Sequence, residues 1–376
     1  MLDEITLLSK EIEIHENVNE NKYVIEYNNN YFLISDFIYD ILSYLKSNNK
    51  IEFKLITEKF NLNNSDAIFI FEEIKRILIT IKTSENKGNI KFKLTIINTK
   101  YVNKISKIFT HLIPQNIKSF TLALLIISTL FFLFFYLLKD NFKTHSEINY
   151  FILYPIFIIT LLFHEFGHAV AARKFGLTPK EIGFGIFFII PILYSNVSCI
   201  WILDKHKRVI VNLSGIYFQL LVSLFFSIFL FEHTELLMIL YSMNIGLLFF
   251  SLFPFIKTDG YWVISDYFDK LNLFERANNY LFMLYKKKEK FNLFYFSYSI
   301  SHFIFIFFVI YTYYKNFHIS ELNIQNLTYK VIFKYTFYLI MMYFLIISLA
   351  SKFKKKTFKN IQLCKLNISF SYHFYA

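Results

Sequence analysis

The chain is poor in cysteine, glycine, proline and charge, and these absences exclude several kinds of protein. Its two cysteines, Cys199 and Cys364, provide neither a disulfide framework nor a cysteine metal site. Charged residues make up only 18% of the chain, whereas 55% is hydrophobic and 21% is aromatic. Soluble globular proteins carry more charge, so this composition indicates a membrane protein. The polar N-terminus lacks the pattern of a cleavable signal peptide.

The net charge of +12 does not indicate a nucleic-acid-binding domain. Residues 1–90, which resemble a soluble domain in composition, carry 10 Lys and Arg against 15 Asp and Glu. Because nucleic acid requires a basic face, this acidic segment argues against such a partner. The basic excess lies in the hydrophobic remainder of the chain, where lysine and arginine report on orientation in a membrane.

Crossing the hydrocarbon core of a bilayer takes roughly 20 helical residues, and several apolar runs reach that length. Six such runs cover 119–138, 150–172, 209–231, 236–256, 293–314 and 331–350. They predict a multi-pass α-helical membrane protein whose main partner is the lipid bilayer.

Lysine and arginine are unevenly shared among the connections between these runs. There are six in each of 173–208, 270–290 and 352–365, but two, none and two in 139–149, 232–235 and 315–330. By the positive-inside rule, both termini are predicted to be cytoplasmic, with the chain in the inner membrane of a bacterium.

The N-terminal residues 1–90 are predicted to form a small cytoplasmic α+β domain of winged-helix type. Strand-like stretches at 11–15, 22–27 and 31–34 are followed by helical patterns at 35–46, 51–60 and 64–80. Asn28, Asn29 and Asn30 suit a hairpin turn, because asparagine tolerates left-handed conformations.

The rest of the chain is expected to contain a linker, a membrane domain and a tail. Residues 91–118 are predicted to form a basic linker with four lysines: Lys100, Lys104, Lys107 and Lys118. These lysines would suit anionic headgroups, but a solvated linker that carries a topology signal is the simpler expectation. Residues 119–351 form the membrane domain, and 352–376 form a basic cytoplasmic tail. Within the membrane domain, 182–194 is too short and too broken to span, so we expect a re-entrant hairpin or a membrane-edge strand there.

The sequence HEFGH at 164–168 places two histidines four residues apart inside an apolar run. On a helix this spacing puts both imidazoles on one side, where they can hold a metal ion. Glu165 can reach a water on that metal as general base, the role that this spacing serves in metalloproteases. The alternative is a pair of packed core histidines, but each charged group inside a span costs at least about 2.5–3.5 kcal/mol. Gly167 would permit close approach of another backbone.

A catalytic zinc ion needs three protein ligands and an open position for water, so a third ligand is expected elsewhere. Asp259 is the best candidate, since Pro254 ends the fourth apolar run and Gly260 lets the chain turn back. Counted from Tyr150 at the outer end, His164 lies about 21 Å into the membrane, near the cytoplasmic side where Asp259 is also expected. We therefore expect zinc to be held by His164, His168 and Asp259.

Through HEFGH and the Pro254…Asp259-Gly260 segment, the sequence resembles the site-2 protease family of intramembrane zinc metalloproteases. It is more similar still to the branch of peptide zinc metalloproteases found with peptide-modification gene clusters, in PILYSNVSCIWILDKHKRVIVNLSG at 191–215 and PFIKTDGYWVISD at 254–266. The resemblance implies the same three ligands, with Glu165 as the base. Two positions depart from it: Ser251 replaces the family's usual Asn, and Asn196 replaces an Asp that is frequent in the branch.

Residues 1–90 resemble, in pattern, the PqqD-like domain that binds leader peptides of ribosomally made, modified peptides. The likeness consists of a short sheet, then YNNNYFLISDFIYDILSYL at 27–45, then two helices. It implies capture of an extended leader peptide at a sheet edge. A generic winged-helix domain is the alternative.

Together these features predict a zinc metalloendopeptidase that acts in the maturation or export of a ribosomally synthesised, modified peptide. Two alternatives stay open: a non-catalytic membrane component that binds or exports such a peptide, and a signalling protease that cleaves membrane-anchored regulators. Asn212, Ser214 and Gln219 in the third apolar run could contact substrate, but packing against neighbouring spans is the simpler expectation.

Overall fold

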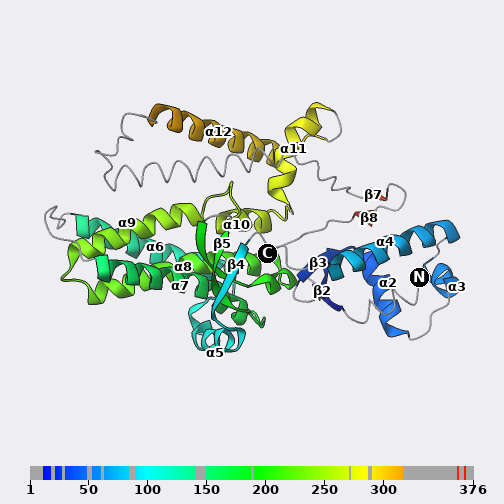
Figure 1. Cartoon of the computed structure of the whole chain (residues 1–376), viewed down its shortest axis with the longest axis horizontal. Helices are drawn as coiled ribbons and strands as arrows, with labels where there is room; N and C mark the ends of the chain where they lie inside the picture. The colour runs from blue at the N-terminus through cyan, green and yellow to red at the C-terminus, as the bar shows by residue number, and fades with distance from the viewer. Residues whose placement is uncertain are drawn as a thin grey trace. The chain divides into compact units, whose positions relative to one another are not determined.

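The computed structural model describes residues 12–17, 22–27, 30–48, 53–60, 63–83, 90–139, 150–187, 190–270, 272–286, 290–316, 362–363 and 368–369. The chain divides into two compact units, one of Met1–Leu252 with Lys359–Ala376 and one of Phe253–Phe358 (Figure 1). Each unit has buried hydrophobic clusters of its own.

The N-terminal part of the first unit has three strands followed by three helices, the order that the sequence predicts. The strands are β1 (Glu13–Asn17), β2 (Lys22–Tyr27) and β3 (Asn30–Ile34), which form an antiparallel sheet in the order β1-β2-β3. The helices are α2 (Asp36–Ser47), α3 (Phe53–Lys59) and α4 (Asn64–Thr83). Tyr27 pairs with Asn30, so β2 and β3 meet across two residues. The predicted asparagine turn falls on those two residues, which lie outside the described ones.

Helical periodicity explains the core of this part. On α2 the apolar residues recur at intervals of three and four, and all four are at most 1% exposed: Ile38, Ile41, Leu42 and Leu45. They pack against a second stripe of buried residues on α4: Ala67, Ile70, Phe71, Ile74 and Leu78. Burial of two such stripes is what makes short amphipathic helices stable in water.

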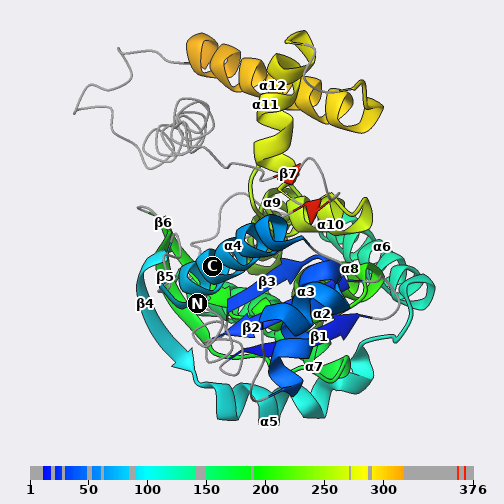
Figure 2. The same ribbon diagram turned by 90° about the vertical axis from the view of Figure 1, so that its right-hand side faces the viewer.

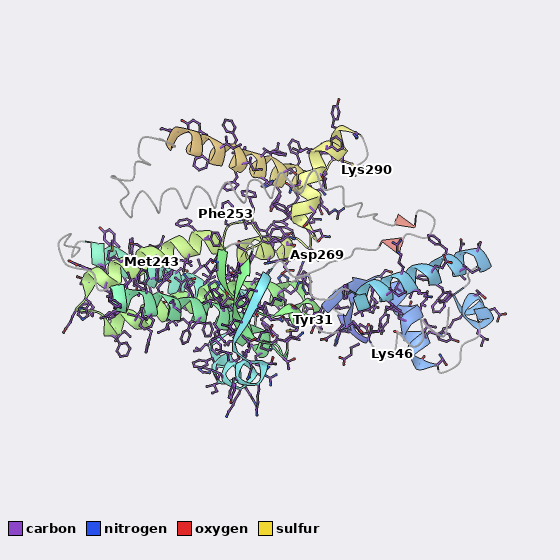
Figure 3. All side chains as sticks on the ribbon, viewed as in Figure 1. Tyr31, Lys46, Met243, Phe253, Asp269 and Lys290 are labelled. Carbon is purple, nitrogen blue, oxygen red and sulfur yellow. The ribbon has the colours of Figure 1, made fainter. Side chains whose placement is uncertain are left out.

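The sheet also touches the short 3-10 helix η2 (Ser198–Ile202), through Val24 and Tyr31 against Cys199 (Figure 3 labels Tyr31). The Tyr31 hydroxyl donates a hydrogen bond of 2.7 Å to Glu26. Burial raises the pKa of Tyr31 above its usual range and that of the Cys199 thiol to about 12. Desolvation lowers the pKa of Lys180, whose Nζ lies 5.5 Å from the Tyr31 ring centroid. At neutral pH the phenol and the thiol of this contact therefore stay protonated.

Within the part of the chain that the structure describes, four helices are long and apolar enough to cross a membrane. They are α6 (Ile117–Lys139), α7 (Tyr150–Lys174), α8 (Lys205–Phe229) and α9 (Thr234–Ser251), drawn from cyan to yellow-green in Figure 1. They correspond to the first four predicted spans, so this is a helical membrane protein. The fifth predicted run forms α12 (Leu293–Asn316), whose apolar described stretch, Leu293–Phe308, is shorter. The sixth, 331–350, lies outside the described residues, and six spans remain a prediction.

A second antiparallel sheet joins the membrane helices. Its strands are β4 (Ile90–Ile97), β5 (Ile182–Phe187) and β6 (Ile190–Ser195), in the order β4-β5-β6 (Figure 2). The pair β5–β6 is the hairpin predicted for 182–194. Gly183 is needed in it, because a Cβ there would lie 2.6 Å from the Leu94 carbonyl oxygen of β4.

Strand β4 and helix α5 (Thr99–Phe109), with the 3-10 turn η1 (Thr110–Leu112), occupy most of the predicted linker 91–118. This segment is more structured than the sequence analysis expects. The cause is a period of two in β4, where Phe92, Leu94 and Ile96 share one face and the intervening Lys93 and Thr95 share the other. Because the lysines make the segment basic, it was predicted to be a linker and its strand pattern was missed.

Helices α7 and α8 pack against each other more extensively than the other helices do. At their crossing, a Cβ on Gly167 of α7 would collide with the backbone carbonyl of Ser214 in α8 and lie 2.9 Å from the Phe218 Cβ. The predicted close approach at Gly167 is therefore present, and α8 is the backbone that approaches.

The second unit contains α10 (Asp259–Tyr267), α11 (Leu273–Tyr285) and α12. Tyr261, Tyr280 and Tyr295 lie in its buried cluster, and the Ser299 hydroxyl donates a hydrogen bond of 2.7 Å to the Ala277 carbonyl. These contacts join α11 to α12.

Two short strands, β7 (Gln362–Leu363) and β8 (Ile368–Ser369), pair near the C-terminus.

We predict that Gly167→Ala destabilises the membrane domain, because the added methyl group would have to push α8 away from α7. Overpacking of this kind costs about 1–3 kcal/mol, which corresponds to a fall of several degrees in the midpoint of thermal unfolding. The measurement is thermal unfolding of the purified full chain in detergent. Gly246→Ala on α9 is the matched control, since nothing lies within 4 Å of the Cβ it would add. Equal midpoints for the two variants would contradict the tight α7–α8 contact.

Candidate metal centre

Helix α7 carries His164 and His168 on one side, as their spacing predicts. The two side chains are 8% and 6% exposed. Their ring centroids are 5.1 Å apart, and their Nε2 atoms approach to 3.4 Å. The two buried rings therefore turn their Nε2 atoms toward the same point.

The partners of the Nδ1 atoms decide which nitrogen of each ring carries the proton. His168 Nδ1 lies 2.8 Å from the backbone carbonyl of Val211, which can only accept, so Nδ1 must carry the hydrogen. His164 Nδ1 lies 3.0 Å from Oε1 of Gln219, also an acceptor. In both neutral rings the lone pair is therefore on Nε2. Two lone pairs 3.4 Å apart repel each other unless a proton or a metal ion lies between them.

Gly215 of α8 keeps the space beside these nitrogens free. A Cβ at this position would lie 2.8 Å from Nε2 of His164 and closer still to Nε2 of His168. The helix therefore presents bare backbone where any other residue would fill the space that both lone pairs face. Imidazole nitrogens with their other ring nitrogen hydrogen-bonded are the usual zinc ligands in proteins, so this cradle fits the predicted metal.

Gln219 is itself held by a hydrogen-bonded chain that runs into α9. Its amide nitrogen donates to the backbone carbonyl of Asn244 at 3.2 Å and to the Asn244 side-chain oxygen at 3.0 Å. The Asn244 amide donates in turn to the Leu240 carbonyl at 2.8 Å. Gln219 is 1% exposed and Asn244 is fully buried. Because both donor bonds fix the amide nitrogen of Gln219, its oxygen is left to face His164.

From the sequence, Gln219 is predicted to pack against neighbouring spans, and no role is predicted for Asn244. A signal was present, because two amides inside apolar spans are costly unless each finds a partner. The sequence does not predict how α8 and α9 are rotated about their axes, and it is this rotation that brings the two amides together.

The other predicted site residues are on α7 and α10. Glu165 follows His164 and is half-buried. Asp259 is the first residue of α10 in the second unit, directly after the N-cap residue Thr258, whose hydroxyl donates to the Phe253 carbonyl at 2.7 Å. The Tyr298 hydroxyl donates 2.6 Å to the carbonyl of Pro254 and so holds the preceding turn. The predicted break at Pro254 and turn at Gly260 are thus where α9 ends and α10 begins.

Asn196, one of the two departures from the family pattern, closes the base of the β5–β6 hairpin. Its side-chain amide donates 3.0 Å to Glu181, and its side-chain oxygen accepts from the Ser198 hydroxyl at 3.1 Å. An aspartate here would place a second carboxylate against Glu181. The amide therefore suits this loop better than the acid that the branch often carries.

A second group of possible ligands, Glu13, His15 and Glu26, lies on β1 and β2. His15 Nε2 is 3.0 Å from a Glu26 oxygen and 3.9 Å from a Glu13 oxygen, and all three side chains are at least partly exposed. An exposed arrangement of this kind is adequately explained as a surface ion pair.

Comparison with known proteins gives one distant similarity. A stretch of 111 residues is 27% identical to the "Putative peptide zinc metalloprotease protein YydH" of Bacillus subtilis (strain 168). The match covers 29% of this chain and 44% of that protein, so the chain aligns with less than half of its relative. No family model and no solved structure matches the chain.

We predict that Gln219→Met and Asn244→Leu each lower the affinity for zinc by about 10- to 100-fold, the usual cost of removing a group that orients a metal-binding histidine. The measurement is a zinc titration of the purified full chain against a competing chelator. Ser242→Ala is the control on α9, because Ser242 is exposed and bonds only within its own helix. Unchanged affinity in Gln219→Met would show that the His164 ring is held by other means.

Proposed function

We propose that this chain is an intramembrane zinc metalloprotease of the site-2 type, with His164, His168 and Asp259 as metal ligands and Glu165 as general base. The observation that carries the proposal is the geometry of the histidine pair. Two buried imidazoles have their protons fixed on Nδ1 and their Nε2 lone pairs turned toward a space that Gly215 leaves open. Two imidazole nitrogens turned to one point are an arrangement that binds zinc.

Further support for the ligand set comes from the chemistry of the three side chains. His164 and His168 each offer an imidazole nitrogen, and Asp259 offers a carboxylate oxygen. Two imidazoles and one carboxylate make up a common catalytic zinc set, which leaves a fourth position for water. The distant similarity to a protein named for zinc proteolysis supports the same choice of metal.

When bound, zinc would polarise a peptide carbonyl and lower the pKa of a coordinated water. Glu165 is proposed to take the proton from that water and to pass it to the nitrogen of the departing peptide. Gln219 and the Val211 carbonyl keep the two histidines in the tautomer that binds metal.

Substrate has to unfold before this site can cut it, because helical peptide bonds are shielded. The strand order β4-β5-β6 leaves the outer edge of β6 without a partner strand in the described sheet. An extended peptide could pair there through its backbone, as peptides do at other sheet edges. We propose that the β5–β6 hairpin presents the unwound substrate to the metal.

We predict that the purified full chain binds about one zinc ion and that Glu165→Gln retains it but loses proteolysis, because the base is not a ligand. Proteolysis should fall by 100-fold or more, the usual contribution of a general base. Metal analysis and a cleavage assay on the same preparations test this. His164→Ala, His168→Ala and Asp259→Ala should each weaken zinc binding instead. Activity that survives in Glu165→Gln would exclude the mechanism, and full zinc binding by Asp259→Ala would exclude the third ligand.

We further propose that the substrate is a ribosomally synthesised, modified peptide whose leader is bound by the N-terminal domain. In that domain β3 lies at the edge of its sheet, and α4 carries exposed apolar residues at 42–46% exposure: Ile68, Phe69 and Ile79. A domain with an edge strand and exposed apolar side chains suits an extended peptide with alternate apolar residues. Tethering by such a domain raises the effective substrate concentration at the protease to the order of millimolar.

We predict that the Glu165→Gln chain binds a labelled precursor peptide encoded nearby, and that removal of residues 1–89, which ends before β4, abolishes this binding. Cleavage of the same precursor by the active chain should slow correspondingly. Fluorescence anisotropy measures the binding. If the shortened chain binds and cleaves as well as the full one, a signalling protease that cuts membrane-anchored regulators becomes the better explanation.

A further inference from the structure

Helix α5 carries a one-sided charge. Its sequence TKYVNKISKIF has lysine at 100, 104 and 107 and no acidic residue. All three lysines are exposed. With 100° between successive residues, Lys100, Lys104 and Lys107 fall within one stripe about 60° wide. The helix therefore presents a row of positive charges with no carboxylate of its own to balance them.

The apolar residues of the same helix form one wide arc made of two adjoining stripes. One contains Val102 and Phe109 and packs on α7. The other contains Tyr101, Ile105 and Ile108, which are 56%, 38% and 63% exposed. An amphipathic helix in water keeps one apolar face and buries it. A second apolar stripe directly beside a lysine row is the pattern of a helix that lies in the membrane interface.

The position of α5 in the chain places it at the bilayer. It ends at Phe109, and the membrane-crossing helix α6 begins at Ile117. Between them, the Tyr217 hydroxyl of α8 donates 3.1 Å to the Leu112 carbonyl. The Asn103 side chain donates 2.8 Å to the Pro179 carbonyl, just before β5. With so short a connection and ties to two other segments, α5 has little freedom to leave the membrane surface.

We propose that the outer face of α5 binds an anionic lipid surface, with Tyr101, Ile105 and Ile108 among the upper acyl chains and Lys100, Lys104 and Lys107 at the phosphates. The lysine stripe supplies the charge complementarity, and the apolar stripe supplies the buried area. None of these residues belongs to the proposed metal site.

Contact with lipid at this face also bears on the metal helix. The Phe109 ring packs edge-on against Phe166 of α7 with centroids 5.6 Å apart. Phe166 stands between Glu165 and Gly167 in the chain. A helix held on the lipid surface therefore supports the turn of α7 that carries the proposed base.

The experiment places the full chain in nanodiscs of phosphatidylcholine, with or without phosphatidylglycerol. An environment-sensitive dye is attached to the I108C variant in a C364S background, and nitroxide-labelled lipid is the quencher. The buried Cys199 thiol, whose pKa burial raises to about 12, stays protonated and does not react. The same dye on the S65C variant, at an exposed position of α4, is the control for non-specific quenching.

Native mass spectrometry of the detergent-solubilised chain measures retained phosphatidylglycerol. Each Lys→Gln change on α5 should lower its apparent affinity about fivefold, and added salt should lower it further. Lys104→Gln with Lys107→Gln is compared with Lys46→Gln and Lys59→Gln, which removes equal charge from the N-terminal domain. Lys100→Arg, Lys104→Arg and Lys107→Arg together should keep binding.

The expected result is quenching at position 108, stronger with phosphatidylglycerol, and none at position 65. No quenching at position 108 in either lipid would overturn the proposal, because protein, a second copy of the chain included, would then cover the face. Equal quenching in both lipids, with unchanged retention in the α5 lysine variants, would overturn it as well, because the lysines would then not recognise the anionic headgroup.

Discussion

The close contact between α7 and α8 is the constraint on which the candidate metal centre depends. Gly167 lets the α8 backbone reach α7 at Ser214, and Gly215, one residue on, leaves room beside both imidazoles. The same contact brings the Val211 carbonyl to His168 and the Gln219 amide to His164. A wider separation of the helices would remove both orienting hydrogen bonds together. The orientation of the two histidines therefore depends directly on how closely α7 and α8 pack.

The candidate site contains polar side chains inside an apolar helix bundle, where an unpaired polar group is costly. Hydrogen bonds between these side chains offset that cost. The chain from His164 through Gln219 and Asn244 to the Leu240 carbonyl crosses three helices, each step between a donor and an acceptor. In an apolar interior an unsatisfied amide costs several kcal/mol, so such a chain holds its members firmly once complete. The helix bundle thereby gains one fixed orientation for the histidine ring.

Much of this arrangement could be predicted from the sequence, and the two features that were missed have different causes. The HEFGH spacing predicted both histidines on one face, the lengths of the apolar runs located four spans, and the short, broken run at 182–194 located the β5–β6 hairpin. Strand β4 was missed because its lysines hide an alternating apolar pattern. The Gln219–Asn244 pair was missed because amide partners depend on how two helices are rotated about their axes. Local periodicity is readable from one segment, whereas contacts between segments are not.

The choice of an amide at position 219 follows from the membrane setting. In soluble zinc sites a carboxylate frequently orients the ligand histidine and makes it more basic. Inside a span a carboxylate would cost at least about 2.5–3.5 kcal/mol and would add a negative charge beside the metal ligands. Glutamine gives the same acceptor to His164 without the charge, but only if its nitrogen cannot rotate into that place. Asn244 prevents this by accepting two hydrogen bonds from that nitrogen. Asn244 thus keeps the side-chain oxygen of Gln219 turned toward His164, so that a neutral residue can orient the histidine inside an apolar helix bundle.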